Sequence, residues 1–216
     1  MKNIQIPITE NGTATLATAG KYCDRNIDVQ VEVPTFEAEL EKEKAVEDGL
    51  LTNTLTEYFN DRITAQIRPN GFRDLPKLQI VKVPRASVNG TNTFCNCTNL
   101  KIVECEREVG YQTFNSCNAL NAVVILGTTR TNMWTTNSFY ASGIEAGTGF
   151  VYVPQNLVES YKAHTNWALF ASQIFPFVNT YQELPAIDGT VYPRCWVREQ
   201  DKAYTYDGAT WTEVAE

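Results

Sequence analysis

The sequence predicts a β-rich solenoid, and three observations lead to that fold class. A short phrase recurs along the middle of the chain, its apolar residues keep one spacing in every copy, and each copy ends with an alternating apolar pair typical of a short strand. Around this solenoid we expect a small N-terminal β module, a linker helix, a helical C-terminal cap and a small C-terminal β meander.

The recurring phrase is clearest where TFCNCTNLKIV is followed, twenty residues later, by TFNSCNALNAV. Three copies begin at Phe72, Phe94 and Phe114, and positions 3, 6, 9 and 11 after each phenylalanine are apolar or cysteine. A fourth copy begins at Phe139 and carries the insertion EAGTG before its strand. These positions are occupied by Leu75, Leu78, Val81 and Val83, by Cys97, Leu100, Val103 and Cys105, by Cys117, Leu120, Val123 and Ile125, and in the fourth copy by Val151 and Val153.

The spacing of the copies predicts how they pack. They start 22, 20 and 25 residues apart, a period typical of solenoids in which one turn cannot bury its apolar face alone. We therefore expect the phenylalanines and leucines to form columns from turn to turn. Each such buried side chain stabilises the fold by roughly 1.5–3 kcal/mol.

The repeat also accounts for three of the six cysteines. Cys97, Cys105 and Cys117 occupy positions that hold aliphatic residues in other copies, so small buried thiols explain them. Only Cys95 is out of register within the repeats. The spacing is not the paired C-x-x-C of zinc sites and the chain has one histidine, so we expect no metal and no cofactor.

The motif F-x-x-C-x-x-L-x-x-V-x-[IVC] resembles the BspA-like leucine-rich repeat. The segment Gly147 to Phe177 looks like the one that closes many such proteins, and Leu50 to Phe72 is similar to the segment that leads into them. The resemblance covers about residues 50–177. It implies a leucine-rich repeat solenoid with its C-terminal cap over residues 61–177.

The cap is expected to begin with a helix at Asn156. Such a helix places Leu157, Tyr161 and His164 on one face. With Trp167, Phe170 and Ile174, that face can cover the open end of the stack, as a solenoid requires for solubility. His164 falls at the end of the helix, where a capping or surface role is expected rather than catalysis.

The N-terminal flank divides into a β module, residues 1–34, and a linker helix with lead-in segment, residues 35–60. Alternation in IDVQVEV favours a strand, and charged pairs within residues 35–49 favour a short helix with a solvated face. The phrase ITENGTATLATAGKYCDRNIDVQVEVP resembles N-terminal segments of virion proteins of bacteriophages and prophages of gut Firmicutes. This resemblance implies that the β module attaches the chain to a particle.

The C-terminal flank, residues 178–216, is predicted to be a linker followed by a three-strand meander. Its strands are expected at Cys195–Val197, Ala203–Tyr206 and Thr210–Val214, with a turn at Asp207-Gly208. A sheet this small is marginal alone, so it should dock on the solenoid or on another chain. Its aromatic residues are expected to form its own core, with stacking on a sugar ring as the alternative; they are Trp196, Tyr204, Tyr206 and Trp211.

Charge and hydropathy limit the classes of partner that we expect for this chain. The net charge of −7 and the pI of about 4.9 disfavour nucleic acid, which requires a basic face. No segment approaches the ~20 consecutive apolar residues of a membrane span. The N-terminus lacks the apolar run of a signal peptide, so we do not expect export by the usual route.

These observations favour a phage virion structural protein, a tail fibre, baseplate or other appendage component, located in the virion and assembled in the host cytoplasm. Its expected partners are other virion proteins and a host-surface receptor or glycan, and we expect a homo-oligomer, with a trimer as one option. The alternative is a bacterial cell-surface adhesion protein. A polysaccharide depolymerase is a third hypothesis, but no catalytic motif supports it and we expect no enzyme.

A solenoid presents many side chains on one rigid face, which predicts where a ligand would bind. The candidate face consists of the positions in and beside each strand that lie outside the apolar pattern. These residues are Gln79, Ile80, Lys82, Lys101, Ile102, Glu104, Asn121, Ala122 and Val124. The alternative is that this strip is an ordinary solvated or oligomer-facing sheet.

Overall fold

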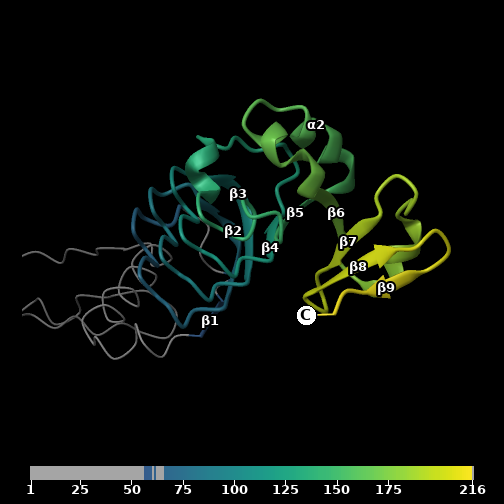
Figure 1. Ribbon diagram of the computed structural model, residues 1–216, viewed down its shortest axis with the longest axis horizontal. Helices are drawn as coiled ribbons and strands as arrows, with labels where there is room; N and C mark the ends of the chain where they lie inside the picture. Colours follow the sequence, from purple (N-terminus) through teal and green to yellow (C-terminus); the bar gives the residue numbers. More distant parts are fainter. Residues whose placement is uncertain (1–55, 60, 62–65, 216) are drawn as a thin grey trace, which may run out of the picture. The chain divides into compact units, whose positions relative to one another are not determined.

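A computed structural model describes residues 56–59, 61 and 66–215 (Figure 1). The predicted N-terminal β module, residues 1–34, and the predicted helix within residues 35–49 lie outside the described residues. In the described part, nine strands form one open sheet whose spatial order is the order of the sequence. The prediction of a β-rich chain with few helices is confirmed.

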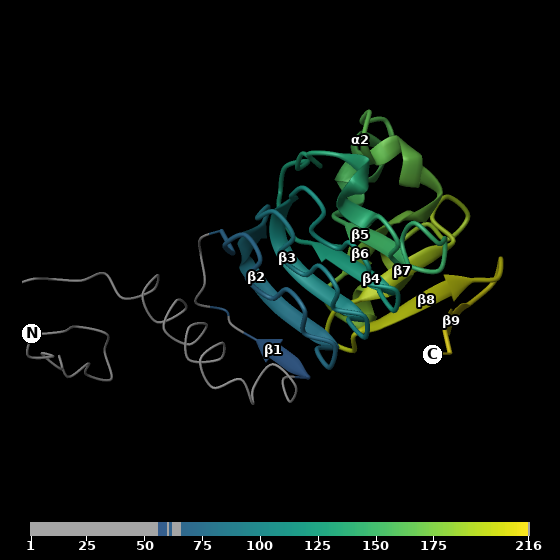
Figure 2. The same ribbon diagram turned by 60° about the vertical axis from the view of Figure 1, so that its left-hand side comes forward.

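The strands are mainly parallel. Strands β1 to β7 pair in parallel, and β7, β8 and β9 pair in antiparallel. Figures 1 and 2 show β2, β3 and β4 side by side. The strands are β1 Glu57–Phe59, β2 Ile80–Val88, β3 Ile102–Val109, β4 Ala122–Ile125, β5 Phe150–Val153, β6 Ile174–Val178, β7 Arg194–Val197, β8 Lys202–Tyr206 and β9 Trp211–Glu213.

The register of the parallel strands follows the spacing in the sequence. Val81 pairs with Val103, Val103 with Val123, Val123 with Val151, and Val151 with Ile174. All five side chains are fully buried. The inward-facing alternation predicted at the end of each copy is therefore present from β2 to β6.

The phenylalanines form a continuous column, as predicted. Ring centroids are 5.4 Å apart between Phe72 and Phe94, 5.5 Å between Phe94 and Phe114, and 5.4 Å between Phe114 and Phe139. The planes of each pair lie within 15° of parallel. The irregular fourth copy thus keeps its aromatic ring in line despite its insertion.

Two positions beside each phenylalanine set the turn. The residue two places after the ring has a positive φ in all four copies: Asp74, Asn96, Ser116 and Ala141. The residue just before three of the rings is a buried hydroxyl, Thr93, Thr113 or Ser138, and each donates to a backbone carbonyl, such as that of Gly90 or Gly110. The hydroxyl residue before the ring and the residue two places after it recur in the sequence as TFCN, TFNS and SFYA. The spacing of apolar residues alone does not indicate the role of either position.

The end of the Phe column is covered by the segment after β5. Trp167 and Phe170 contact Phe139, with ring centroids 6.1 Å and 5.2 Å away. Tyr161 and Trp167 both hydrogen-bond to Thr131, which fixes the segment on the stack. Tyr161, Trp167 and Phe170 thus lie in the cap as predicted, whereas Leu157 is half-buried and the neighbouring Val158 is buried in its place.

The helical content of the cap is lower than predicted. The α-helix is only α2, Val158–Lys162, preceded by the 3-10 turn η3, Gln155–Leu157, and followed by η4, Trp167–Gln173. Phe170 leaves the helical conformation, with φ −109° and ψ 16°. A continuous helix would carry the aromatic residues away from Phe139, so the chain turns back toward it. No helix in the described residues is both long and apolar enough to cross a membrane.

The predicted C-terminal meander is present as β7, β8 and β9. The 3-10 helix η5, Tyr181–Ala186, leads into it, and a further 3-10 helix, η2, Thr136–Phe139, lies between β4 and β5. Asp207 and Gly208 form the turn between β8 and β9, where Asp207 accepts from the amides of Ala209 and Thr210. The meander continues the parallel sheet because β6 pairs with β7.

Candidate functional site: the outer face of the parallel sheet

The predicted binding face lies on the outer side of β2, β3 and β4, and the structure brings all nine residues together in three rows. Lys101 donates its amide to the carbonyl of Gln79 at 2.8 Å, and Asn121 donates to that of Lys101 at 2.9 Å. Strand pairing aligns the other two rows, which are Ile80, Ile102 and Ala122, and Lys82, Glu104 and Val124.

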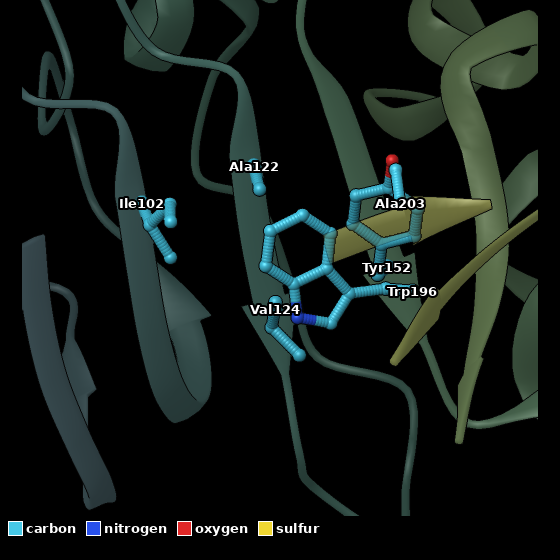
Figure 3. Packing of buried hydrophobic residues seen from close by; sticks show 6 residues of the cluster. All are labelled: Ile102, Ala122, Val124, Tyr152, Trp196 and Ala203. Carbon is cyan, nitrogen blue, oxygen red and sulfur yellow. The ribbon is translucent and has the colours of Figure 1, made fainter. Parts of the chain in front are cut away.

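The chain's own C-terminal segment covers much of this face. We call residues 179–215 the cover module and the set Ile102, Ala122, Val124 and Tyr152 the outer strip. Trp196 of β7 lies over the outer strip, between Val124 and Tyr152, and its ring centroid is 5.2 Å from that of Tyr152 (Figure 3). Ala203 of β8 completes the contact.

The cover module determines which residues of the predicted binding face remain accessible to a ligand. Ile102, Glu104, Ala122 and Val124 are buried, whereas Ile80, Lys82 and Lys101 are half-buried and Gln79 and Asn121 are exposed. The buried four contact the cover module or the sheet itself in this conformation. A ligand contact on the face stays a prediction, and only its rim is open as the chain is folded here.

Two ion pairs join the face to the cover module. Arg198 donates from Nε and a terminal nitrogen to both carboxylate oxygens of Glu104, at 3.0 Å and 2.7 Å. Lys82 donates to Asp201 at 2.6 Å. The Glu104 side chain is 6% exposed, against 26% for Arg198, so this carboxylate has exchanged water for the bidentate guanidinium.

A third polar contact lies at β5. Arg194 donates from Nε to the hydroxyl of Tyr152 at 2.9 Å, and its guanidinium lies 3.7 Å from the ring centroid of Phe150. Burial raises the pKa of Tyr152 to about 12, and the neighbouring Arg194 opposes that rise. The phenol therefore stays protonated at neutral pH and acts as a hydrogen-bond acceptor for Arg194.

Two polar atoms at the contact are buried without a hydrogen-bond partner. They are Nε1 of Trp196 and Oδ1 of Asp201. A buried donor or acceptor without a partner costs roughly 1–3 kcal/mol relative to its hydrated state. The contact between the cover module and the sheet is therefore not optimised in every detail.

The aromatic residues of the meander mostly form internal packing. Trp196 and Tyr204 are buried, and Tyr206 and Trp211 are half-buried with ring centroids 5.4 Å apart. Tyr204 belongs to a core within the C-terminal part, together with Val178, Leu184, Ile187, Cys195 and Val197. The expectation that these residues form the meander's own core holds for Tyr204, whereas Trp196 packs on the parallel sheet.

The thiols have structural surroundings. Cys97 donates to the carbonyl of Phe72 at 2.8 Å, and Cys117 donates to that of Phe94 at 3.1 Å. Burial raises the pKa of Cys97 to about 12 and raises the pKa of Cys105 and Cys117 as well. In the described part all cysteines are free and buried, and no three metal-ligating side chains come together there.

His164 lies just after α2 and is half-buried. Its amide donates to the carbonyl of Tyr161 at the end of the helix, and a capping role of its side chain stays a prediction. Its Nδ1 is buried without a partner. Burial first, and then the charge of Arg130, lowers the pKa of His164, so the imidazole is neutral at pH 7.

Sequence reasoning missed a set of large side chains that stay exposed. Trp134 is 63% exposed and Tyr140 is 56% exposed. Both lie between the apolar positions of the repeat, so their place in the sequence could have indicated that they are exposed. The others are Phe59, Tyr111, Leu169, Tyr181 and Val191.

Comparisons with protein-family models, curated proteins and solved structures gave no match to this chain. The site is therefore described from its own residues.

Proposed function

We propose that β1 to β6 with their cap form a BspA-like leucine-rich repeat solenoid. The observation that carries this is the aligned column of Phe72, Phe94, Phe114 and Phe139, with ring centroids 5.4 to 5.5 Å apart. The valine column of β2 to β5 repeats with the same register. A stack whose interior is filled in this way presents its outer residues on a rigid frame suited to binding.

We further propose that the chain is a structural component of a bacteriophage particle, as part of a tail fibre, baseplate or other appendage. The resemblance of residues 8–34 to the N-terminal segments of phage virion proteins supports this, because an attachment module joined to a rigid repeat stack fits an appendage. Its partners in this proposal are other virion proteins and a host-surface receptor or glycan.

Mass spectrometry of purified particles tests the virion proposal. The prophage would be induced, and particles banded twice by density would be digested and quantified against a capsid protein. We expect peptides from residues 66–215 at a fixed ratio to capsid. Their absence from particles that contain the other tail proteins would contradict the proposal.

The same cells separate the main alternative, a bacterial surface adhesion protein. This alternative requires the chain in the surface fraction when no phage gene is expressed. Detection there, and not in particles, would replace the virion proposal. A depolymerase would instead release oligosaccharides from host capsule. We propose a binding role rather than catalysis because Glu104, the buried carboxylate of the sheet face, is already ion-paired with Arg198.

We propose that the chain is a homo-oligomer in the particle, with a trimer as one option for an appendage. Light scattering after size exclusion would measure the mass of the full chain, whose monomer is 24.3 kDa. A mass near three times that value supports the trimer. A chain that stays monomeric at the high local concentration of a particle would contradict the proposal of a homo-oligomer.

A further inference from the structure

We propose that the cover module, residues 179–215, is a hinged lid on the outer strip: it pivots on β6 and alternates between covering and exposing that strip. Four features of the structure carry this inference: the way β6 changes partner, the separate core of the cover module, the polar groups that flank the contact, and its two unpartnered atoms. The inference does not depend on the chain being a virion protein.

Strand β6 supplies the hinge. Its first half, Ile174 to Pro176, pairs with β5, and its second half, Phe177 and Val178, pairs with β7. Pro176 has no amide hydrogen and therefore donates no ladder bond at the change of partner. A rotation between Pro176 and Phe177 moves the cover module while both sets of strand pairs stay intact.

The cover module moves as one body because it has its own interior. Leu184, Cys195 and Val197 are buried together, with Val178 from the second half of β6. Strands β7, β8 and β9 are held by antiparallel pairing that does not involve the parallel strands. Lifting the module from the outer strip leaves this interior covered.

Polar groups flank the apolar centre of the contact that holds the lid closed. It consists of the bidentate pair of Arg198 with Glu104, the pair of Lys82 with Asp201, and the bond from Arg194 to Tyr152. Such groups are well solvated when separated, so opening exchanges their mutual bonds for bonds to water. An apolar contact of equal area would not have that alternative.

Opening also relieves two costs of the closed state. Nε1 of Trp196 and Oδ1 of Asp201 are buried without partners when the lid is closed, and water reaches both when it opens. Against this, closing buries the indole of Trp196 and the side chains of Ile102 and Val124. The ion pairs add to this apolar contact in the closed state, so their removal is expected to favour the open state.

Thiol labelling of the full chain tests the lid. Val124→Cys places a reporter thiol under Trp196, and the native thiols serve as internal controls. Cys105 and Cys117 report on the interior of the stack, whereas Cys195 reports on the interior of the cover module. N-ethylmaleimide would be added for increasing times, and peptide mass spectrometry would give the labelling rate of each thiol separately.

Charge reversal sets the lid open or closed. Glu104→Arg in the Val124→Cys background places two guanidinium groups together, and Arg198→Glu added to it restores opposite charges. We expect labelling of the reporter to rise at least about tenfold with the first change and to return close to its starting rate with the second. Arg73→Glu, which affects an exposed pair with Asp74 remote in sequence from the cover module, is the matched control and should leave the rate unchanged.

The native thiols distinguish a moving lid from unfolding. Labelling of the reporter alone, with Cys105, Cys117 and Cys195 protected, supports the lid. Labelling of Cys195 together with the reporter means that the cover module unfolds, which overturns the proposal. An unchanged reporter rate after Glu104→Arg, with the chain folded, also overturns it.

Lys82→Met decides the question if Glu104→Arg leaves the chain unfolded and all thiols react. It removes only the pair with Asp201, whose side chains are 25% and 31% exposed, and leaves the buried pair of Glu104 intact. We expect the labelling rate of the reporter thiol to rise several-fold while Cys105 and Cys195 stay protected. No increase in the reporter rate would overturn the proposal.

Discussion

At Gly110 the chain runs too close to the preceding turn for any side chain. A Cβ atom there would lie 2.5 Å from the carbonyl carbon of Asn89, and Gly90, four residues before its phenylalanine like Gly110, shows the same crowding against Ile67 and Arg68. Glycine is thus required by close approach between turns. The repeat pattern of large apolar residues gives no indication of this requirement.

Gly110→Ala should lower the free energy of unfolding by about 3 kcal/mol, because backbone atoms must move to admit the methyl group. Gly147→Ala is the control: its Cβ would meet nothing within 4 Å, but its φ of 79° costs about 1 kcal/mol. Urea unfolding followed by circular dichroism would measure both. Equal losses would mean that close approach at Gly110 contributes nothing.

Four residues with positive φ occupy equivalent positions of the repeat, and Ala141 is the one without a polar side chain. Its φ is 51°, whereas Asn96 and Ser116 at the equivalent positions have side chains that can hydrogen-bond locally. Ala141→Gly should raise the free energy of unfolding by about 0.5 kcal/mol, the relief of strain less the added freedom of the unfolded chain. Thermal unfolding would measure it.

Ala163→Gly provides the opposite control. Ala163 ends α2 with an ordinary helical φ of −81°, so glycine there relieves no strain. We expect a loss of about 0.5–1 kcal/mol. A gain at both positions would contradict the interpretation that the sign of φ decides the effect.

At the scale of elements, the cap illustrates how one end of the stack is closed. Trp167 is fully buried, contacts Phe139 and Tyr161, and donates from Nε1 to the carbonyl of Thr131 at 3.1 Å. Leu169, in the same 3-10 segment, is 69% exposed. The two residues are two places apart but belong to different faces of the segment.

Trp167→Ala should cost about 3–5 kcal/mol, because it removes a large buried side chain and leaves the ring of Phe139 uncovered. Leu169→Ala is the matched control and should change stability by less than about 0.5 kcal/mol. Guanidinium unfolding monitored by far-ultraviolet circular dichroism would measure both. Comparable losses would show that the cap is not fixed through Trp167.

The cap also shows where a pattern predicts residues better than conformation. The sequence indicated correctly that Tyr161, Trp167 and Phe170 cover the stack. It predicted a longer helix, because apolar spacing alone does not reveal that Phe170 must leave the helix to reach Phe139. The covering role depends on composition, whereas the path of the backbone depends on the surface to be covered.

At the scale of the whole molecule, the buried thiols make stability depend on alkaline pH. Burial raises the pKa of Cys97 and of Cys195 from 9.0 to about 12, and it also raises the pKa of Cys105 and Cys117. Above pH 9 the unfolded chain loses these protons while the folded chain keeps them. Stability is therefore full below pH 9 and falls as the pH rises toward 12.

Each thiol contributes about 1.4 kcal/mol of lost stability per pH unit above pH 9, so the loss from four is several kcal/mol by pH 10. Urea unfolding in the presence of a reductant, between pH 8 and pH 10.5, would measure the slope. Cys97→Val should reduce that slope by the contribution of one thiol. A free energy of unfolding that stays constant over this range would contradict burial of the thiols in the folded chain.

The sequence alone determined the interior of the described part. The positions of Phe94, Leu100, Val103 and Cys105 were predictable because neighbouring turns bury identical positions against one another, so a period in the sequence becomes a column in space. The sequence also indicated the meander and that it needed a surface to dock on.

Only the tertiary structure decided which surface that is. Glu104 and Arg198 are 94 residues apart, and Trp196 reaches Tyr152 because β6 exchanges one partner for another at Pro176. Contacts between elements that do not repeat leave no period in the sequence. For this reason the sequence could place the residues of the predicted face on one side of the sheet, while the coverage of that face by the chain's own last strands could be seen only in the folded molecule.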